Sequence, residues 1–148
     1  MSLNTEELVI ENLDKTFTVG DRQINALQCI NLTVRTGEFV NIIGPSGCGK
    51  STLLRCIAGF EKPSNGRVKL GGEEIKGPGI DRMMVFQDFD QLFPWYTVLD
   101  NIIFALKVTK MGASKAERTE MAHYYLKLVG LTGFEKFYPH QLSGGMRQ

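Results

Sequence analysis

The first third of the chain mixes β-branched residues with alternating apolar and polar positions, a pattern that predicts strands. Residues 7–19 and 24–34 carry it, and the turn-like sequence VGDR lies between them. Residues 67–75 predict a shorter strand with its own Gly-Gly turn, after another turn at residues 61–66. We therefore expect this part of the chain to be rich in β-structure.

Two further stretches are almost continuously apolar, which is typical of strands buried on both faces. They are GEFVNIIG at residues 37–44 and MMVFQ at residues 83–87. The loop-like sequence GPGIDR precedes the second stretch. Both stretches are predicted to be buried strands, and the first is predicted to end at Gly44.

A helix is predicted between these two stretches, at residues 50–60. Its pattern places Leu53, Leu54 and Ile57 on one helical face. Gly59 lies where a glycine commonly ends a helix. A strand, a glycine-rich loop and a helix are therefore expected to follow one another here.

From residue 97 onward the pattern is helical. Residues 97–112 predict one helix, and Ser114 with Glu117 forms the capping box of another that ends near Gly130. The apolar residues at helical spacing in the second of these helices are Met121, Tyr125 and Val129. A β-rich half with one helix is thus followed by an all-helical half.

Composition narrows the class of protein. The 148 residues are 43% hydrophobic and 22% charged, as in ordinary globular domains, and a net charge of +1 without a basic block argues against nucleic-acid binding. No apolar run approaches the roughly 18 residues of a membrane span, and the acidic N-terminus does not resemble a signal peptide. We expect a cytoplasmic chain that reaches a membrane through a partner, with Cys29, Cys48 and Cys56 as free thiols.

Residues 44–52, GPSGCGKST, match the phosphate-binding pattern G-x-x-x-x-G-K-[ST]. In such a loop, backbone N–H groups point inward and lead into a helix N-terminus, where the helix dipole favours phosphate. Lys50 would reach the β- and γ-phosphates, and the Ser51 hydroxyl would hold Mg²⁺. The alternative is a chance glycine-rich turn, which the predicted strand before the loop and helix after it disfavour.

The loop supplies most of the candidate site residues. Those predicted to bind nucleotide are Gly44, Ser46, Gly47, Cys48, Gly49, Lys50, Ser51 and Thr52. Cys48 is either a small residue that fits the loop or a reactive thiol, activated by the helix N-terminus and by Lys50. In the second case, we expect alkylation of Cys48 to block nucleotide binding and MgATP to protect the thiol.

The tail LSGGMRQ, residues 142–148, has the residues of a second phosphate motif. Its serine can cap a helix and offer a hydroxyl to an anion, and its two glycines let backbone N–H groups approach phosphate closely. Together with GPSGCGKST, this tail resembles the signature motif of the ATP-binding subunits of ABC transporters. The resemblance implies contact with the ATP of the opposite subunit in a head-to-tail dimer through Leu142, Ser143, Gly144, Gly145 and Gln148.

The same resemblance assigns Gln87, in VFQDF, to the Q-loop, where it would reach Mg²⁺ and the attacking water. Lys50 and Gln87 are thus the predicted catalytic residues, and Ser51 and Gln87 the predicted Mg²⁺ ligands. A rival interpretation takes MMVFQD as a degenerate Walker B strand with Asp88 as the Mg²⁺ acid. The glutamine at the end of the predicted strand disfavours this rival.

Residues 77–102 resemble the branch of the family that serves nitrate, sulfonate, taurine and bicarbonate uptake, through GPG-x-DR before VFQ and LFPW-x-TVLDN after it. Phe17 lies where the family places an aromatic ring that stacks on adenine; a core or hairpin aromatic is the alternative. Phe93, Trp95 and Tyr96 either form a socket for the coupling helix of the membrane subunit or belong to the core of the helical lobe.

The resemblance implies an α/β fold: a P-loop NTPase of ABC type, with an antiparallel β-subdomain, an incomplete RecA-like core and an α-helical subdomain. Residues 1–87 would hold the β-subdomain, the partial core and the phosphate loop, and residues 88–148 the Q-loop, the helical subdomain and the signature motif. Walker B, the catalytic glutamate and the switch histidine follow the signature motif in the family and cannot be assigned here. Neither His123, expected on a helix surface, nor His140, expected in a loop, has the place of the switch histidine. We therefore expect exposed apolar strands, a marginal fold and weak ATPase activity or none.

The function implied by the resemblance is that of the ATP-binding subunit of an ABC importer, with ATP and Mg²⁺ as cofactors. Its partners would be a second ATP-binding subunit, the transmembrane permease subunits and, indirectly, a solute-binding protein, at the cytoplasmic face of the membrane. The solute would be a small oxyanion such as nitrate, sulfonate or taurine. The alternatives are a truncated, non-hydrolysing nucleotide-binding or regulatory module and a soluble ABC-type ATPase, which the single phosphate loop and LFPW disfavour.

Overall fold

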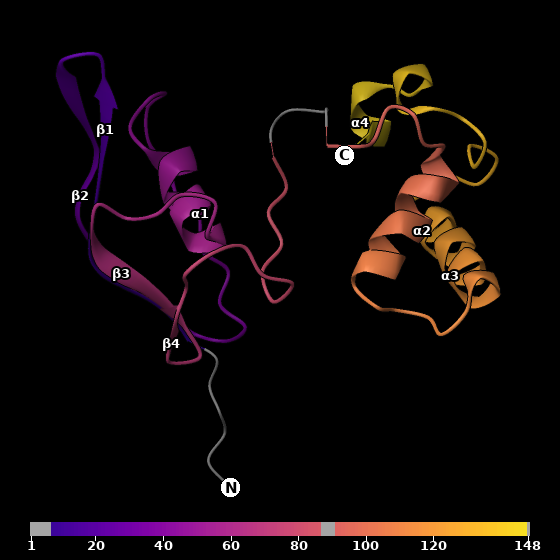
Figure 1. Cartoon of the computed structure of the whole chain (residues 1–148), viewed down its shortest axis with the longest axis horizontal. Helices are drawn as coiled ribbons and strands as arrows, with labels where there is room; N and C mark the ends of the chain where they lie inside the picture. Colours follow the sequence, from indigo (N-terminus) through magenta and orange to yellow (C-terminus); the bar gives the residue numbers. More distant parts are fainter. Residues whose placement is uncertain (1–6, 87–90, 148) are drawn as a thin grey trace, which may run out of the picture. The chain divides into compact units, whose positions relative to one another are not determined.

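The structure, a computed structural model, describes residues 7–86 and 91–147. The chain divides into two compact units, Met1–Met84 and Val85–Gln148. The first unit contains a sheet and one helix, and the second is helical (Figure 1). Three residues named above, Gln87, Asp88 and Gln148, lie outside the described residues.

The first unit is built on a long hairpin of β1 (Leu8–Val19) and β2 (Arg22–Val34). β3 (Asn65–Leu70) pairs with the other side of β1, and the short β4 (Glu73–Glu74) follows, so that the strand order is β2-β1-β3-β4. Neighbouring strands are antiparallel, and tight turns connect β1 to β2 and β3 to β4. The strands predicted at residues 7–19, 24–34 and 67–75 are thereby confirmed.

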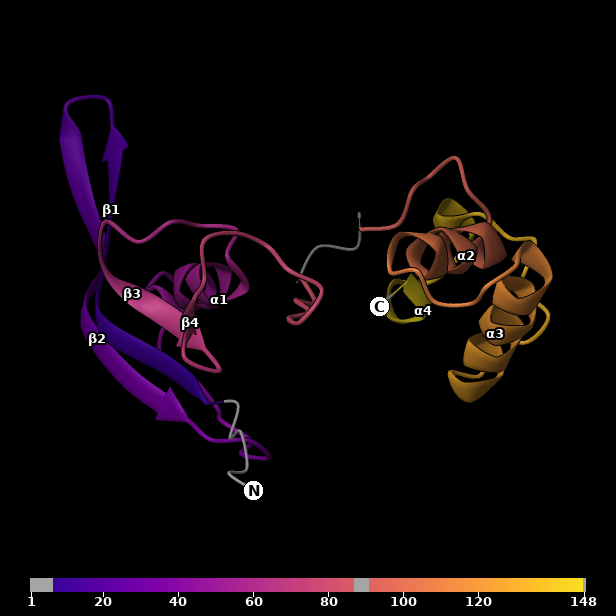
Figure 2. The ribbon, with the colours of Figure 1, turned by 60° about the horizontal axis from the view of Figure 1, so that its bottom comes forward.

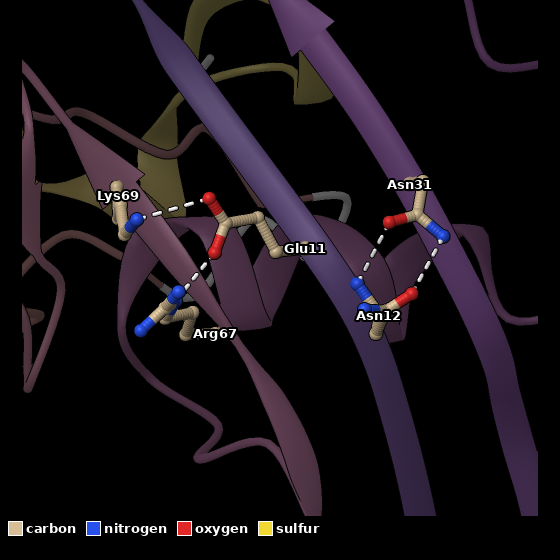
Figure 3. A network of polar contacts seen from close by, with 5 residues as sticks. All are labelled: Glu11, Asn12, Asn31, Arg67 and Lys69. Atoms are coloured by element: carbon tan, nitrogen blue, oxygen red, sulfur yellow. Dashed lines mark hydrogen bonds and ion pairs between the residues drawn. The ribbon is translucent and has the colours of Figure 1, made fainter.

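A bulge at Asn12 bends β1, and polar side chains hold it from both sides. Asn12 has a positive φ of 47°, and its backbone N–H donates to Asn31 Oδ1 (2.9 Å), while Asn31 Nδ2 donates to Asn12 Oδ1 (3.2 Å). The preceding residue, Glu11, turns to the other neighbour and pairs with Arg67 and Lys69 of β3 (Figure 3). Both strands next to β1 therefore fix the bulge.

α1 (Lys50–Ala58) packs against the sheet and forms the core of the first unit (Figure 2). The buried residues of this core are Ile10, Leu13, Leu27, Leu53, Cys56 and Val68. The helix ends at Gly59 in the left-handed conformation (φ 80°), as predicted. Any Cβ at this position would collide with the backbone of Gly77, so the helix end and the loop at residues 77–82 approach closely.

Two predicted strands are wrong for the described residues: residues 37–44 and 83–86 are irregular. Their apolar side chains are exposed, by 89% at Phe39, 92% at Ile43 and 93% at Met83. A strand buried on both faces needs neighbouring strands to pair with its backbone, and none of the strands in the described residues pairs with either stretch. Apolar side chains are thus exposed here as expected, but on irregular segments and not on strands.

The second unit contains α2 (Val98–Val108) and α3 (Lys115–Leu128), and each helix starts with a side-chain cap, of which the sequence predicted the one at Ser114. The Thr97 hydroxyl accepts from the backbone N–H of Asp100 (3.1 Å) at the start of α2. The Ser114 hydroxyl accepts from the backbone N–H of Glu117 (3.1 Å) at the start of α3. The predicted capping box is incomplete, because the Glu117 carboxylate accepts from the N–H of Ala113 (2.7 Å) and not from that of Ser114.

α3 buries Ala122 and Leu126, each one position after a predicted residue, Met121 or Tyr125, whereas Tyr125 and Val129 are 37% and 67% exposed. The helix carries apolar side chains on two overlapping faces, so periodicity alone could not choose between them. The core of this unit consists of Val98, Leu126 and Leu142. Among the residues that the structure describes, none of the helices is long and apolar enough to span a membrane.

Candidate functional site

The phosphate loop, residues 44–49, owes its shape to glycines. Gly47 (φ 80°) and Gly49 (φ 97°) both adopt the left-handed conformation, which residues with a Cβ rarely adopt. Gly49 also approaches β2 so closely that a Cβ there would collide with the carbonyl oxygen of Ala26. The loop is therefore fixed against the sheet at the point where α1 begins.

Lys50, the first residue of α1, folds back over this loop. Its Nζ donates to the carbonyl oxygens of Gly44 (2.8 Å) and Pro45 (2.6 Å) and lies 3.6 Å from Cys48 Sγ. The ammonium is thus held at the positive end of the helix dipole, and the first turn of α1 contains no acidic residue. This arrangement favours a polyanion such as a nucleotide phosphate.

Two hydroxyl residues continue the site along the first turn of α1. Ser51 is exposed and Thr52 is half-buried, and Ser46 lies in the turn of the loop before them. The described residues contain no group of three or more His, Cys, Asp or Glu side chains that could hold a metal ion. The Ser51 hydroxyl, together with phosphate oxygens and water, provides the oxygen ligands that Mg²⁺ accepts.

Phe17 is connected to the phosphate loop through the hairpin. It pairs with Ile24, two positions along β2 from Ala26, the residue that Gly49 approaches. Two residues of strand span about 7 Å, which is on the scale of the sugar that separates a base from its phosphates. Phe17 is half-buried, and Lys15 Nζ lies 4.8 Å from the centre of its ring.

The signature stretch begins a helix in the second unit. Leu142 is 6% exposed and anchors the stretch in the core. The carbonyl oxygen of Ser143 accepts from the backbone N–H groups of Met146 (3.1 Å) and Arg147 (3.2 Å), so that α4 (Gly144–Arg147) starts directly after the serine. Ser143 and Gly145 are exposed, whereas Gly144 is half-buried. The phosphate loop and this stretch belong to different units of the chain.

The three aromatic residues before α2 form one surface cluster with Phe104. The centre of the Phe93 ring lies 5.4 Å from that of Trp95, 5.6 Å from that of Tyr96 and 4.8 Å from that of Phe104. Trp95 remains 66% exposed, and the buried core of the unit consists of other residues. Trp95 is therefore not a core residue of this unit, whereas Phe93 and Tyr96 are partly covered by their neighbours.

Asn101 is a residue whose role the sequence did not reveal. It is 8% exposed, its Oδ1 accepts from the backbone N–H of Phe93 (2.8 Å), and its Nδ2 donates to the carbonyl oxygens of Phe93, Tyr96 and Thr97 (3.0–3.2 Å). One buried amide thus fixes the loop that carries the aromatic cluster. The sequence feature that could have indicated this role is the position of Asn101, a polar residue three positions after Val98 on the buried face of α2.

The two histidines lie outside this site. His123 is exposed on α3, 4.0 Å from a Glu135 oxygen, as predicted for a helix surface. His140 lies in the short 3-10 helix η1 (Pro139–Gln141) and not in a plain loop, because Pro139 and the Gln141 side chain, which accepts from the N–H of Tyr138 (2.7 Å), form a turn. Neither histidine has a position from which a role in nucleotide binding can be argued.

Known proteins resemble this chain along most of its length. It is 52% identical to an uncharacterized ABC transporter ATP-binding protein of Methanocaldococcus jannaschii, over 96% of this chain and 52% of the relative. It is 48% identical to the nitrate import ATP-binding protein NrtD of Synechocystis, over 95% of this chain and 52% of the relative. Other relatives are named for bicarbonate and taurine transport. The chain thus spans about half the length of these relatives, and the predicted resemblance to this branch is confirmed.

Solved structures and a family model point to the same kind of protein as these relatives. An ATP-binding cassette, solved as a dimer in a post-hydrolysis state with ADP and Pi, matches with a TM-score of 0.83 and 36% identity, over 95% of this chain and 65% of that one. This match confirms the predicted fold class. The model of the ABC transporter family matches residues 27–148. With the phosphate loop and the signature stretch in place, the chain belongs to the ABC transporter family.

Proposed function

We propose that this chain is the nucleotide-binding part of an ABC importer subunit that binds ATP with Mg²⁺ and hydrolyses it to drive solute uptake. The observation that carries the proposal is the phosphate loop: two left-handed glycines deliver the chain to α1, and Lys50 is held over the loop at the N-terminus of that helix. Such a site binds the phosphates of a nucleotide through backbone N–H groups, a helix dipole and an ammonium.

The predicted site residues have a place in this proposal, except Leu142, which is buried in the core and not open to a partner's nucleotide, and Gln148, which lies outside the described residues. Residues 44–52 hold phosphate, Ser51 and Gln87 hold Mg²⁺, and Phe17 stacks on adenine. Ser143, Gly144 and Gly145 offer a hydroxyl and open backbone N–H groups to the nucleotide of a second subunit in a head-to-tail dimer. The exposure of Ser143 and Gly145 supports this role, because a partner must reach them.

The proposed solute is a small oxyanion such as nitrate, a sulfonate, taurine or bicarbonate. This proposal rests on the motifs around VFQ and LFPW and on the nitrate, bicarbonate and taurine transport for which the relatives are named. The subunit would act at the cytoplasmic face of a membrane, bound to permease subunits and served by a solute-binding protein. The exposed indole of Trp95, on a loop fixed by a buried amide, suits the docking of a partner helix.

Two substitutions in the full-length protein test the nucleotide roles. We expect Lys50→Ala to abolish ATP binding, because the ammonium is removed from the loop. We expect Ser143→Arg to leave ATP binding unchanged but to abolish hydrolysis, because the bulky side chain blocks the approach of the partner's nucleotide. Binding is measured by calorimetry and hydrolysis by phosphate release. Normal hydrolysis in Ser143→Arg would contradict the signature role.

A mixing experiment tests the head-to-tail dimer. A mixed dimer of Lys50→Ala and Ser143→Arg subunits contains one intact site, made from the loop of the second variant and the signature of the first. Mixing the two inactive variants should therefore restore part of the ATPase activity. If the mixture stays inactive although cross-linking shows that the two variants form mixed dimers, the composite site is excluded. The non-hydrolysing module is favoured if the wild type binds ATP but never hydrolyses it.

Two substitutions test the Q-loop role of Gln87 against the rival interpretation, in which MMVFQD is a Walker B strand and Asp88 binds Mg²⁺. Gln87→Ala is expected to lower hydrolysis strongly, whereas Asp88→Ala should have a small effect. A total loss only with Asp88→Ala would identify MMVFQD as the Walker B strand instead. ATP binding, measured in both variants, separates a lost catalytic group from a damaged site.

A further inference from the structure

Lys15 occupies an unusual position between the sheet and the end of α1. Its Nζ lies 2.9 Å from Glu61 Oε2 and donates to the carbonyl oxygen of Lys62 (2.8 Å). Both partners follow directly after the helix that begins at the phosphate loop. The Lys15 side chain is 13% exposed, so that most of its surface is covered by neighbouring residues.

The same ammonium lies over the face of the Phe17 ring, 4.8 Å from the ring centre. Two other contacts hold this part of β1 to the segment after α1: the backbone N–H of Thr16 donates to Ser64 Oγ (3.0 Å), and the N–H of Ser64 donates to the carbonyl oxygen of Asp14 (2.8 Å). The ring is therefore held between a fixed strand and a fixed cation.

A cation on one face of an aromatic ring has two effects on a ligand that stacks on the other face. It draws electron density toward itself, and the opposite face becomes a better partner for an electron-rich purine. It also restricts the ring before the ligand arrives, which lowers the entropic cost of binding. Partial burial of the Lys15 side chain strengthens the first effect, because water screens a partly covered ammonium less than a fully exposed one.

We propose that Lys15 determines base recognition. Its fixed positive charge lies over one face of the Phe17 ring, so that the other face stacks on the adenine of the bound nucleotide. The inference rests on the proposed function, since it takes Phe17 as the adenine-binding ring. Lys15 itself touches the ring and not the nucleotide, so it acts as a positioning and specificity-determining residue.

The experiment compares MgATP with magnesium tripolyphosphate, which has the phosphates but no base. Dissociation constants are measured by calorimetry in full-length wild type, Lys15→Met, Lys15→Arg and the matched control Lys62→Met, which removes an exposed neighbouring charge. Lys15→Met should weaken ATP binding about two- to fivefold and leave tripolyphosphate binding unchanged. Lys15→Arg and Lys62→Met should bind both ligands like wild type.

A second variant protects the test against misfolding. Lys15→Met leaves the Glu61 carboxylate without its cation, so Lys15→Met/Glu61→Gln is measured as well. Tripolyphosphate binding reports a folded loop in each variant. Equal weakening of ATP and tripolyphosphate, or no weakening of ATP, would overturn the inference.

Phe17→Leu separates this inference from the proposed function. If Phe17→Leu weakens ATP binding but not tripolyphosphate binding, and Lys15→Met then has no further effect in that background, both ideas stand. If Phe17→Leu is selective for ATP but Lys15→Met has no effect in wild type, the role of Lys15 is wrong and that of Phe17 remains. If Phe17→Leu binds ATP normally, the assignment of the adenine site to Phe17 fails, and the role of Lys15 with it.

Discussion

Single residues of the phosphate loop carry the chemistry. Gly47 and Gly49 have backbone conformations that disfavour side chains, and the pattern G-x-x-x-x-G-K-[ST] locates Gly49 because its constraint is local. The position of Lys50 was predictable for the same reason. The contacts of its ammonium with Gly44 and Pro45 were not, because they depend on how the loop closes on itself.

Cys48 provides a direct probe of this loop. Its sulfur is exposed and lies 3.6 Å from Lys50 Nζ, so a bound nucleotide would cover it. We expect a thiol-alkylating reagent to block nucleotide binding and MgATP to slow the alkylation of Cys48 at least severalfold, as measured by mass spectrometry of the modified peptide.

The other cysteines set the controls for this measurement. Cys29 is also exposed, so the experiment is carried out in a Cys29→Ser variant. Cys56 is buried, and burial raises the pKa of its thiol, so it should react slowly. An alkylation rate of Cys48 that does not change with MgATP would show that the sulfur lies outside the nucleotide site.

At the scale of elements, α2 and the aromatic loop before it depend on Asn101. Replacing Asn101 by alanine removes its hydrogen bonds to the backbone N–H of Phe93 and to three backbone carbonyl groups. We expect Asn101→Ala to destabilise the protein by about 1–3 kcal/mol. Urea unfolding followed by the fluorescence of Trp95, the sole tryptophan of the chain, measures the effect directly at this loop.

Lys107→Ala is the control for this prediction, because it changes an exposed residue of the same helix. Its unfolding curve and its Trp95 emission should match those of wild type. If Asn101→Ala unfolds at the same urea concentration as this control, the amide does not hold the loop.

The β1–β2 hairpin has a pH-sensitive contact at Asp14. Its carboxylate accepts from the backbone N–H of Cys29 (2.6 Å) and from Asn65 Nδ2 (3.1 Å), and these bonds lower its pKa, with the Cys29 bond as the larger cause. A lowered folded-state pKa stabilises the fold above the unfolded-state value of about 4. This contribution is lost as the pH falls through the folded-state pKa.

Thermal unfolding between about pH 6 and pH 3 tests the contact at Asp14. Wild type should lose more stability toward acid than Asp14→Asn, which has no charge to lose. The comparison is needed because hydrogen bonds from Lys69 and Gly133 also lower the pKa values of Glu11 and Glu135. Parallel curves for the two proteins would exclude Asp14 as a source of the acid sensitivity.

At the scale of the whole molecule, exposed apolar segments should govern the behaviour of the 148-residue polypeptide. Ile43 and Met83 are more than 90% exposed, and a net charge of +1 provides little repulsion between copies. We expect this polypeptide by itself to self-associate, with an average mass by light scattering that rises with concentration, and to be a weak ATPase.

Two variants, one double and one single, distinguish exposed apolar segments from general instability as the cause of the association. Ile43→Ser with Met83→Ser should reduce the association without lowering the unfolding temperature, whereas Leu13→Ser, in a fully buried position, should unfold the first unit. A monomer with a sharp melt and ordinary ATP turnover would contradict the prediction.

The sequence by itself determined the features whose causes are local. The hairpin at residues 7–34, the phosphate loop, the caps at Thr97 and Ser114 and the helix end at Gly59 all follow from nearby residues. A turn, a cap or a left-handed glycine needs a few neighbouring groups along the chain, so a single sequence can specify it. The family resemblance rests on motifs of this local kind.

Only the tertiary structure decided the features that need distant partners. Residues 37–44 and 83–86 have the composition of buried strands, yet they are irregular, because a strand forms only beside another strand. The choice of Ala122 and Leu126 as the buried face of α3, and the contacts of Asn101, likewise depend on packing. Lys15 and Phe17 are two residues apart in the sequence, but it is the segment after α1 that holds the ammonium over the ring.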